Sequence, residues 1–168
     1  GAVDFQREPR GILPSMLDAL LQRRKAAKRE MAQAEGLARA IANGKQLALK
    51  LVANSIYGFT GAAELGMLPQ PQIAAAVTYM GRKLTLGTKA LCEKEEGVTC
   101  VYGDTDSVFL RLEGVHDIAQ ASRRAQQLAA MVDALIPAPN RLEFEKVYHP
   151  LLLKGKKRYC GRKYEEGE

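Results

Sequence analysis

Features that would place a chain in a membrane, outside the cell or around zinc are missing here. There is no apolar run long enough to span a bilayer and no signal-peptide pattern, so we expect no membrane partner. The three cysteines have neither Cys-X-X-Cys spacing nor a histidine nearby, which disfavours a zinc site or a set of disulfides. We therefore expect reduced thiols in an intracellular protein.

The charge and length of the chain indicate what kind of partner and how many domains to expect. With 25 Lys and Arg against 19 Asp and Glu, its net charge of +6 suits a polyanionic partner, although many enzymes carry such charge on a solvated surface. Its 168 residues, 46% of them hydrophobic, suffice for one domain with a real core or for a piece of a larger protein. The chain begins at Gly1 without an initiator methionine and stops at Glu168, so we expect it to be cut at both ends.

The apolar periodicity predicts an α+β fold. Helices are expected at about residues 13–35, 37–55, 72–95 and 117–135, with a glycine- and proline-containing loop over 58–71. Strands are expected at about 99–102, 107–112, 142–148 and 151–153, before a basic turn at 155–159. We expect Gly58 to close the second helix. The first two helices then form an antiparallel hairpin, followed by part of an antiparallel sheet with packed helices.

Two carboxylates separated by one residue are the first candidate for chemistry. Asp104 and Asp106 lie between two short apolar runs, and residues at i and i+2 on extended backbone point to the same face. A bend between the flanking strands would lift that face to the tip of a hairpin. Concentrated negative charge on a rigid element suits a hard cation such as Mg²⁺. Alone, an Asp-X-Asp string would be read as an ordinary polar turn.

Basic side chains on the first two helices form the second candidate. Arg24 and Lys28 are four residues apart and share a helix face, as do Lys50 and Asn54 on the next helix. A hairpin would gather them into an electropositive surface for a triphosphate. Lys50 and Asn54 lie in an apolar stretch that includes Leu51, which argues against a solvated charge run. For the first helix, a solvated basic face stays an open alternative.

Carboxylates and a triphosphate-facing surface are both needed for two-metal phosphoryl transfer. Three motifs then resemble family B DNA polymerases. Lys50-Leu-Val-Ala-Asn54-Ser55-Ile-Tyr57-Gly58 resembles their fingers motif, and Tyr102-Gly-Asp-Thr-Asp-Ser107 resembles the palm motif with catalytic aspartates. Lys156-Lys157-Arg158-Tyr159 resembles the Lys-Lys-X-Tyr motif that holds the primer-template. The resemblance extends from about residue 12 to residue 164.

This resemblance implies a DNA-directed DNA polymerase, a nucleotidyltransferase that extends a primer 3′ end during DNA replication with two Mg²⁺ ions. The implied segments are an entry at 1–12, a fingers helical hairpin at 13–58, a partial palm at 59–154 and a palm end at 155–168. The implied partners are primer-template DNA and deoxynucleoside triphosphates, with a sliding clamp and accessory subunits held through other parts of the polymerase.

The resemblance also assigns roles to the residues that would bind the incoming nucleotide. Arg24, Lys28 and Lys50 would contact the triphosphate, and Asn54 would stand beside it. Tyr57 would pack at the nascent base pair, with its ring near the sugar, where it would help to exclude ribonucleotides.

The remaining implied roles concern the metals and the DNA. Asp106 would be a direct metal ligand, and Asp104 would be its acidic partner nearer the primer end and a less certain ligand. Lys157 would reach the minor groove next to the primer terminus, within a DNA-binding motif whose other members are Lys156, Arg158 and Tyr159. The carboxylates of Glu143 and Glu145 would lie near the metal site, with structural ion pairs as the alternative for each.

One expected carboxylate is absent from the pattern. Family B catalysis uses a further aspartate in an upstream Asp-Phe-X-Ser-Leu-Tyr-Pro-Ser motif, and only the first two residues of that motif are echoed here, by Asp4 and Phe5. Asp4 also lies too close to the fingers, so we reject it as the missing ligand. We therefore expect the isolated chain not to polymerise DNA.

Two other functions and two branches of the family stay open at this point. The string Asp104-Thr-Asp106-Ser-Val108 also fits a haloacid-dehalogenase-like phosphatase, although Tyr102 and Gly103 interrupt the buried strand that such enzymes need. A basic DNA-binding module without catalysis is the non-enzymatic alternative. Within the family, a delta-type catalytic subunit would work in the nucleus, and a large-DNA-virus polymerase in the host nucleus or a viral factory.

Overall fold

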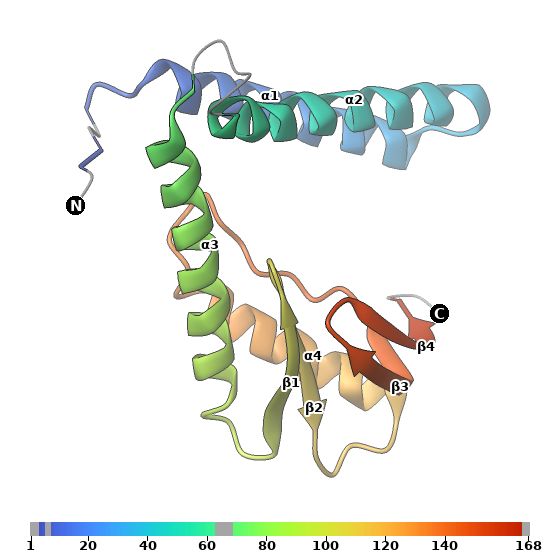
Figure 1. Ribbon diagram of the computed structural model, residues 1–168. Coiled ribbons are helices and arrows are strands. Elements are labelled where there is room, and N and C mark those ends of the chain that lie inside the picture. The colour runs from blue at the N-terminus through green and yellow to red at the C-terminus, as the bar shows by residue number, and fades with distance from the viewer. Residues whose placement is uncertain (1–3, 6–7, 63–68, 166–168) are drawn as a thin grey trace. The chain divides into compact units, whose positions relative to one another are not determined.

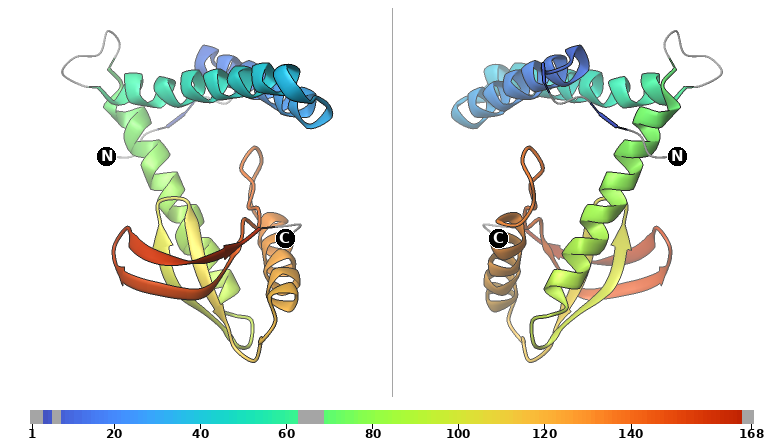
Figure 2. Two further views of the ribbon diagram at one scale, coloured as in Figure 1. Left: turned by 90° about the vertical axis from the view of Figure 1, so that its right-hand side faces the viewer. Right: turned by 90° about the vertical axis from the view of Figure 1, so that its left-hand side faces the viewer.

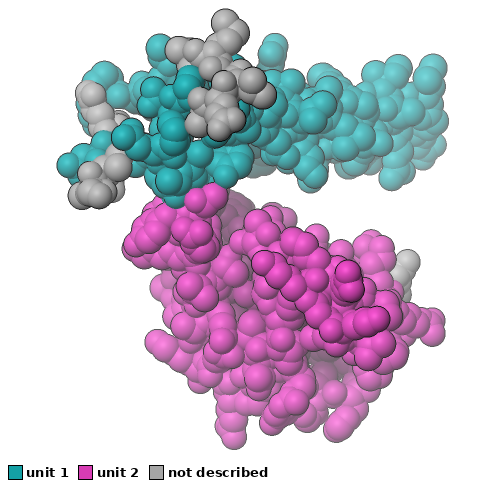
Figure 3. Space-filling view, in the orientation of Figure 1, with its two compact units in different colours: residues 1–77 teal, residues 78–168 magenta. Residues whose placement is uncertain are grey.

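The computed structural model describes residues 4–5, 8–62 and 69–165, which belong to two compact units (Figure 1, Figure 3). The first unit comprises residues 1–77 and the second residues 78–168. Helix α3 (Pro71–Cys92) begins in the first unit and continues into the second. Among the described residues, no helix is both long enough and apolar enough to cross a membrane.

The first unit is built on two long helices, α1 (Ile12–Gln33) and α2 (Gly36–Gly61), which run antiparallel (Figures 1 and 2). The connection between them is short, and Gly36 adopts a left-handed backbone with φ of 53°, which glycine tolerates without steric cost. Buried alanines on each helix, Ala27 and Ala42, allow close packing. The predicted helical hairpin is confirmed.

Helix α2 is longer than the sequence predicts, because Gly58 does not end it. Gly58 lies inside the helix without a positive φ, and the helix continues to Gly61. The Thr60 hydroxyl donates to the Tyr57 carbonyl at 2.9 Å, and the Thr60 carbonyl accepts the Gln70 N–H at 2.8 Å. Glycine lowers helix propensity but stops a helix only in a capping conformation. Residues 63–68 of the predicted loop lie outside the described residues.

The second unit packs α3 and α4 (Ile118–Asp133) on a hairpin of β1 (Val98–Asp104) and β2 (Ser107–Leu112). The strands pair antiparallel, with a register shift between Cys100 and Tyr102. Side chains from all three layers meet in the core, whose buried members are Cys92, Val98, Leu128 and Val132. This arrangement confirms the α+β class and fixes the hairpin that carries Asp104.

A second antiparallel hairpin, of β3 (Val147–Gly155) and β4 (Arg158–Tyr164), forms its own two-stranded sheet. Its turn consists of Lys156 and Lys157 only, so the predicted basic turn over 155–159 is too long, and its last two residues belong to β4.

The predicted strand over 142–148 is wrong for most of its length. Residues 141–146 are irregular, and the strand begins at Val147, where the predicted strands at 142–148 and 151–153 merge into β3. The physical reason lies at the end of α4. The Asp133 carboxylate accepts the Leu142 N–H at 2.8 Å, and the Leu142 side chain packs on the core, so this backbone finds its partner at a helix end.

Candidate functional site

The two aspartates lie at the tip of the β1–β2 hairpin. Strand β1 ends at Asp104 and β2 begins at Ser107, so Thr105 and Asp106 form a two-residue loop. Thr105 has a positive φ of 46°, and the Asp106 N–H donates to the Asp104 carbonyl at 2.5 Å. The predicted tip is confirmed. The predicted extended backbone is wrong, since Asp106 belongs to the turn and strand alternation does not orient it.

Helix α3 holds this tip through a threonine that sequence reasoning did not single out. The Thr85 hydroxyl lies 3.1 Å from the Thr105 carbonyl oxygen and 3.1 Å from the Gly81 carbonyl oxygen. The Thr105 hydroxyl in turn donates to Asp104 Oδ1 at 3.0 Å. No sequence signal marks Thr85, because its acceptor is twenty residues away on another element.

Lys157, in the turn of the other hairpin, reaches the same tip. Its Nζ lies 2.8 Å from Oδ1 and 2.7 Å from Oδ2 of Asp104. Its backbone N–H donates to the Tyr102 hydroxyl oxygen at 2.8 Å, and its own φ is 60°. The structure thus brings together the motif with the aspartates and the Lys-Lys-Arg-Tyr motif.

This ion pair shifts the pKa of both partners. The Lys157 ammonium, by hydrogen bonding, lowers the pKa of Asp104, and the Asp104 carboxylate raises the pKa of Lys157. An opposite charge at hydrogen-bonding distance favours the charged form of each group. Because the pair is exposed to solvent, its effect is local positioning of the ammonium more than overall stability.

Aromatic packing joins the two hairpins beneath this pair. The Phe109 ring lies 5.1 Å from Tyr159 and 6.0 Å from Tyr148, and Tyr102 lies 5.9 Å from Tyr159, measured between ring centroids. These distances and tilts are typical of favourable aromatic pairs. Tyr159 of the Lys-Lys-Arg-Tyr motif therefore serves as the packing link that keeps Lys157 above Asp104.

Asp106 differs from Asp104 in having a free carboxylate. Its side chain is exposed, and no hydrogen bond or ion pair of that side chain occurs within the described part of the chain. An accessible carboxylate at a rigid turn fits Mg²⁺, which usually takes one or two carboxylates and completes its shell with water and phosphate oxygens. Asp104 already shares both carboxylate oxygens with Lys157, although Oδ2 has a further lone pair for a metal.

The glutamates of the 141–146 segment are the remaining acidic candidates. Glu143 and Glu145 are exposed on irregular backbone, and Glu145 pairs with the neighbouring Lys146 at 3.6 Å. Within residues 4–5, 8–62 and 69–165, no group of three or more metal-ligating side chains occurs. The predicted strand is wrong here, but exposure still alternates along residues 141–146, with both glutamates at exposed positions. Glu145 forms an ion pair, and a place for either glutamate near the metals stays a prediction.

The nucleotide-binding candidates lie on the two helices of the first unit. Lys28 on α1 is exposed, as are Lys50, Asn54 and Tyr57 on α2. Arg24 is half-buried, and its Nε donates to Gln46 Oε1 on α2 at 3.4 Å.

The apolar neighbours of Lys50 are less buried than the sequence suggests. Leu51 is 71% exposed, because the extensive packing of α2 among the described residues of its unit is against α1. Lys50 therefore lies on an exposed part of α2 and not in a core.

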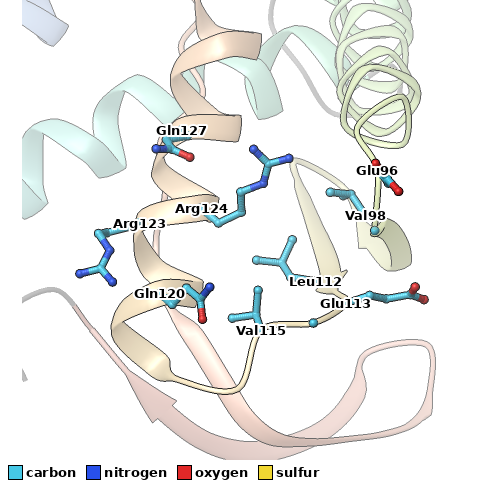
Figure 4. Close-up of a pocket in the computed structure, with 11 residues that line it drawn as sticks. Glu96, Val98, Leu112, Glu113, Val115, Gln120, Arg123, Arg124 and Gln127 are labelled. Atoms are coloured by element: carbon cyan, nitrogen blue, oxygen red, sulfur yellow. The ribbon is translucent and has the colours of Figure 1, made fainter.

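A cavity of about 480 Å³ opens at the other end of the β1–β2 hairpin (Figure 4). Side chains of α4, among them Gln120 and Arg124, face the ends of the strands around Val98 and Leu112. Arg124 pairs with Glu95 at 3.1 Å. This cavity is separated from Asp104 and Asp106 by the whole length of the hairpin and contains none of the predicted site residues.

Comparison with known proteins decides the family. The model of DNA polymerase family B matches residues 2–168. The chain belongs to this family. Its membership overturns the phosphatase interpretation of the Asp-Thr-Asp tip and confirms the resemblance carried by the three motifs.

Individual relatives of this family B chain come from cells and from viruses. It is 48% identical over 161 residues to the DNA polymerase delta catalytic subunit of Mesocricetus auratus, covering 90% of this chain and 14% of the relative. It is 40% identical over 172 residues to the DNA polymerase of Paramecium bursaria Chlorella virus NY2A, covering 97% of this chain and 19% of the relative. The chain thus spans less than a fifth of these relatives.

A solved structure is also similar. The family B DNA polymerase from the archaeon Pyrobaculum calidifontis matches with a TM-score of 0.67 and 26% sequence identity, over 95% of this chain and 20% of that one. The likeness extends over both helical and strand-containing parts of the family B chain.

Proposed function

We propose that this chain supplies the fingers helices and part of the palm of a DNA-directed DNA polymerase that extends primer 3′ ends. The observation that carries the proposal is the contact between Lys157 and Asp104. These residues belong to two family motifs that are 53 positions apart in sequence, and their side chains meet at 2.7 Å. If primer-template DNA binds at the acidic tip, both motifs would contribute to the same site.

The reaction would be attack of the primer 3′ oxygen on the α-phosphorus of the incoming nucleotide. A new phosphorus–oxygen bond forms, the bond between the α-phosphorus and the pyrophosphate oxygen breaks, and the hydroxyl proton passes to water. Asp106 would contribute its exposed carboxylate to holding Mg²⁺, which, when bound, would supply positive charge for the attacking oxygen and the leaving group. Asp104 would act chiefly on Lys157.

The second hairpin would position the DNA. The Lys157 ammonium, held by Asp104 and by the backbone contact to Tyr102, would face the minor groove beside the primer terminus. Lys156 and Arg158 flank it and are exposed, which suits phosphate contacts. Tyr159 would support this surface through its ring contacts.

The helices α1 and α2 would bind the triphosphate. Arg24, Lys28 and Lys50 carry three positive charges on neighbouring helices, and such a group of cations favours the binding of a polyphosphate. Asn54 would lie beside the phosphates, one helical turn after Lys50. Tyr57 would face the base pair and sugar. The fingers segment would extend to Gly61, where α2 ends.

The test is primer extension by the full-length polymerase that carries this segment. Asp106→Asn should reduce synthesis at least about 100-fold, since it removes a group that acts on the transition state. Glu96→Gln, a matched loss of one carboxylate at the far end of the hairpin, should leave synthesis unchanged. Equal activity of the two variants would remove Asp106 from the active site.

The isolated 168-residue chain should not synthesise DNA, because its sequence lacks the upstream aspartate motif. Robust Mg²⁺-dependent extension by this polypeptide alone would refute that statement. A non-catalytic DNA-binding function would be favoured instead if the full-length protein bound primer-template but showed no synthesis in any assay.

A further inference from the structure

We infer that Gln46 is a positioning residue for Arg24, holding the guanidinium so that its outer nitrogens face the incoming triphosphate. This inference rests on the proposed nucleotide-binding role of α1 and α2. It adds a residue that lies in none of the three family motifs.

The contact between the two helices is specific. Gln46 is only 8% exposed, and its Oε1 accepts the Arg24 Nε–H at 3.4 Å. Within the described residues, this is the single hydrogen bond of the Arg24 side chain. A guanidinium has five N–H donors, so four of them, on the two terminal nitrogens, stay free for phosphate oxygens.

A third residue sets the direction of the amide. Gln46 Nε2 donates to Asn43 Oδ1 at 3.0 Å, one turn earlier on α2. With the nitrogen engaged there, the oxygen of the same amide must face Arg24. A flipped amide would set an N–H against the N–H of Arg24 and leave a nearly buried oxygen without a donor, which costs free energy.

The choice of an amide rather than a carboxylate follows from charge. A glutamate at position 46 would also accept from Arg24, but it would neutralise the positive charge and repel a polyanion. The adjacent Lys45 shows the contrast, because it forms an ion pair with Glu30 on α1 at 3.1 Å. Gln46 fixes the guanidinium geometrically while its full charge stays available to phosphate.

If Arg24 is already held in place, nucleotide binding costs less side-chain conformational entropy. An unrestrained arginine samples many rotamers, and immobilising it on association weakens affinity. Loss of Gln46 should therefore appear mainly as weaker nucleotide binding, with the chemical step less affected.

The test measures single-nucleotide incorporation by the full-length polymerase. Gln46→Met, which keeps the volume but removes the acceptor, should raise KM for the nucleotide about fivefold, the effect of one net hydrogen bond, and change kcat less than about twofold. Lys45→Met, which breaks the neighbouring contact between the same helices, should leave KM unchanged. Asn43→Ala frees the amide and should raise KM about twofold, and it serves if Gln46→Met fails to fold.

A double-mutant cycle separates positioning from a merely structural role. In an Arg24→Ala background, Gln46→Met should have no further effect on KM, because the residue it positions is gone. An equal effect of Gln46→Met in both backgrounds overturns the inference. The inference is also overturned if Arg24→Ala raises KM while Gln46→Met and Asn43→Ala do not. Either outcome leaves the proposed function intact. An unchanged KM in Arg24→Ala itself contradicts the nucleotide-binding role of the helices.

Discussion

Lys157 contacts Asp104 through both carboxylate oxygens, at 2.8 and 2.7 Å, although Asp104 ends a strand of one hairpin and Lys157 lies in the turn of the other. Each turn contains a non-glycine residue at positive φ, Thr105 at 46° and Lys157 at 60°. Such conformations cost about 1–3 kcal/mol each and persist where surrounding contacts hold them. Here the contacts are the ion pair itself, the Tyr102 hydroxyl and Thr85 on α3.

The protonation of Asp104 should depend on Lys157. In the intact chain the pKa of Asp104 lies below its ordinary value, so the pair is complete above that ordinary value and is lost as pH falls through the lowered pKa. Lys157→Met should raise the Asp104 pKa toward its ordinary value. An NMR titration of the Asp104 carboxyl carbon measures this pKa. The Lys156 ammonium lowers the Asp104 pKa less than Lys157 does, so Lys156→Met should shift that pKa little. Equal shifts would show that the local net charge, not the contact, sets this pKa.

The two aspartates should separate DNA binding from chemistry in the full-length polymerase. Asp104→Asn removes the negative charge that holds Lys157, so primer-template affinity should fall about fivefold to tenfold, measured by fluorescence anisotropy. Asp106→Asn should leave this affinity within about twofold. If both substitutions affected affinity and rate alike, the distinct roles of the two carboxylates would be contradicted.

Lys50 should matter for the nucleotide rather than for the fold. Lys50→Ala should raise the nucleotide KM about tenfold and slow incorporation, because a charged contact to the triphosphate is lost. Lys25→Ala, an equal loss of charge from an exposed position on α1, is the control and should be near neutral. Unchanged kinetics in Lys50→Ala would reassign this lysine to the solvated surface.

The core of the second unit should be sensitive to small cavities. Val132 is fully buried at 0% exposure between α4 and the β1–β2 hairpin, so Val132→Ala should lower the free energy of unfolding by about 2 kcal/mol. Val101, 41% exposed at the register shift of β1, is the matched control, and Val101→Ala should cost less than about 0.5 kcal/mol. Urea denaturation of the 168-residue chain measures both. Equal losses would place Val132 outside the core.

Local patterns predicted most of the secondary structure. The helical periodicity of the first sixty residues sufficed for α1 and α2, and the apolar runs around the Asp-Thr-Asp string sufficed for β1 and β2. Errors occurred where tertiary contacts override propensity. The segment after Asn140 alternates like a strand, but its first residues bind Asp133 and pack on the core. Gly58 lies inside a helix that continues to Gly61.

The sequence by itself determined the family, the acidic tip and the basic helix pair, because each depends on residues close together along the chain. Only the tertiary structure decided how the residues are used. It paired Asp104 with Lys157, placed Gln46 against Arg24, and gave the Asp106 side chain no hydrogen-bond partner among the described residues. These contacts join residues 53 and 22 positions apart. Such pairings depend on packing between elements and on the direction of single side chains, which periodicity along the chain does not encode.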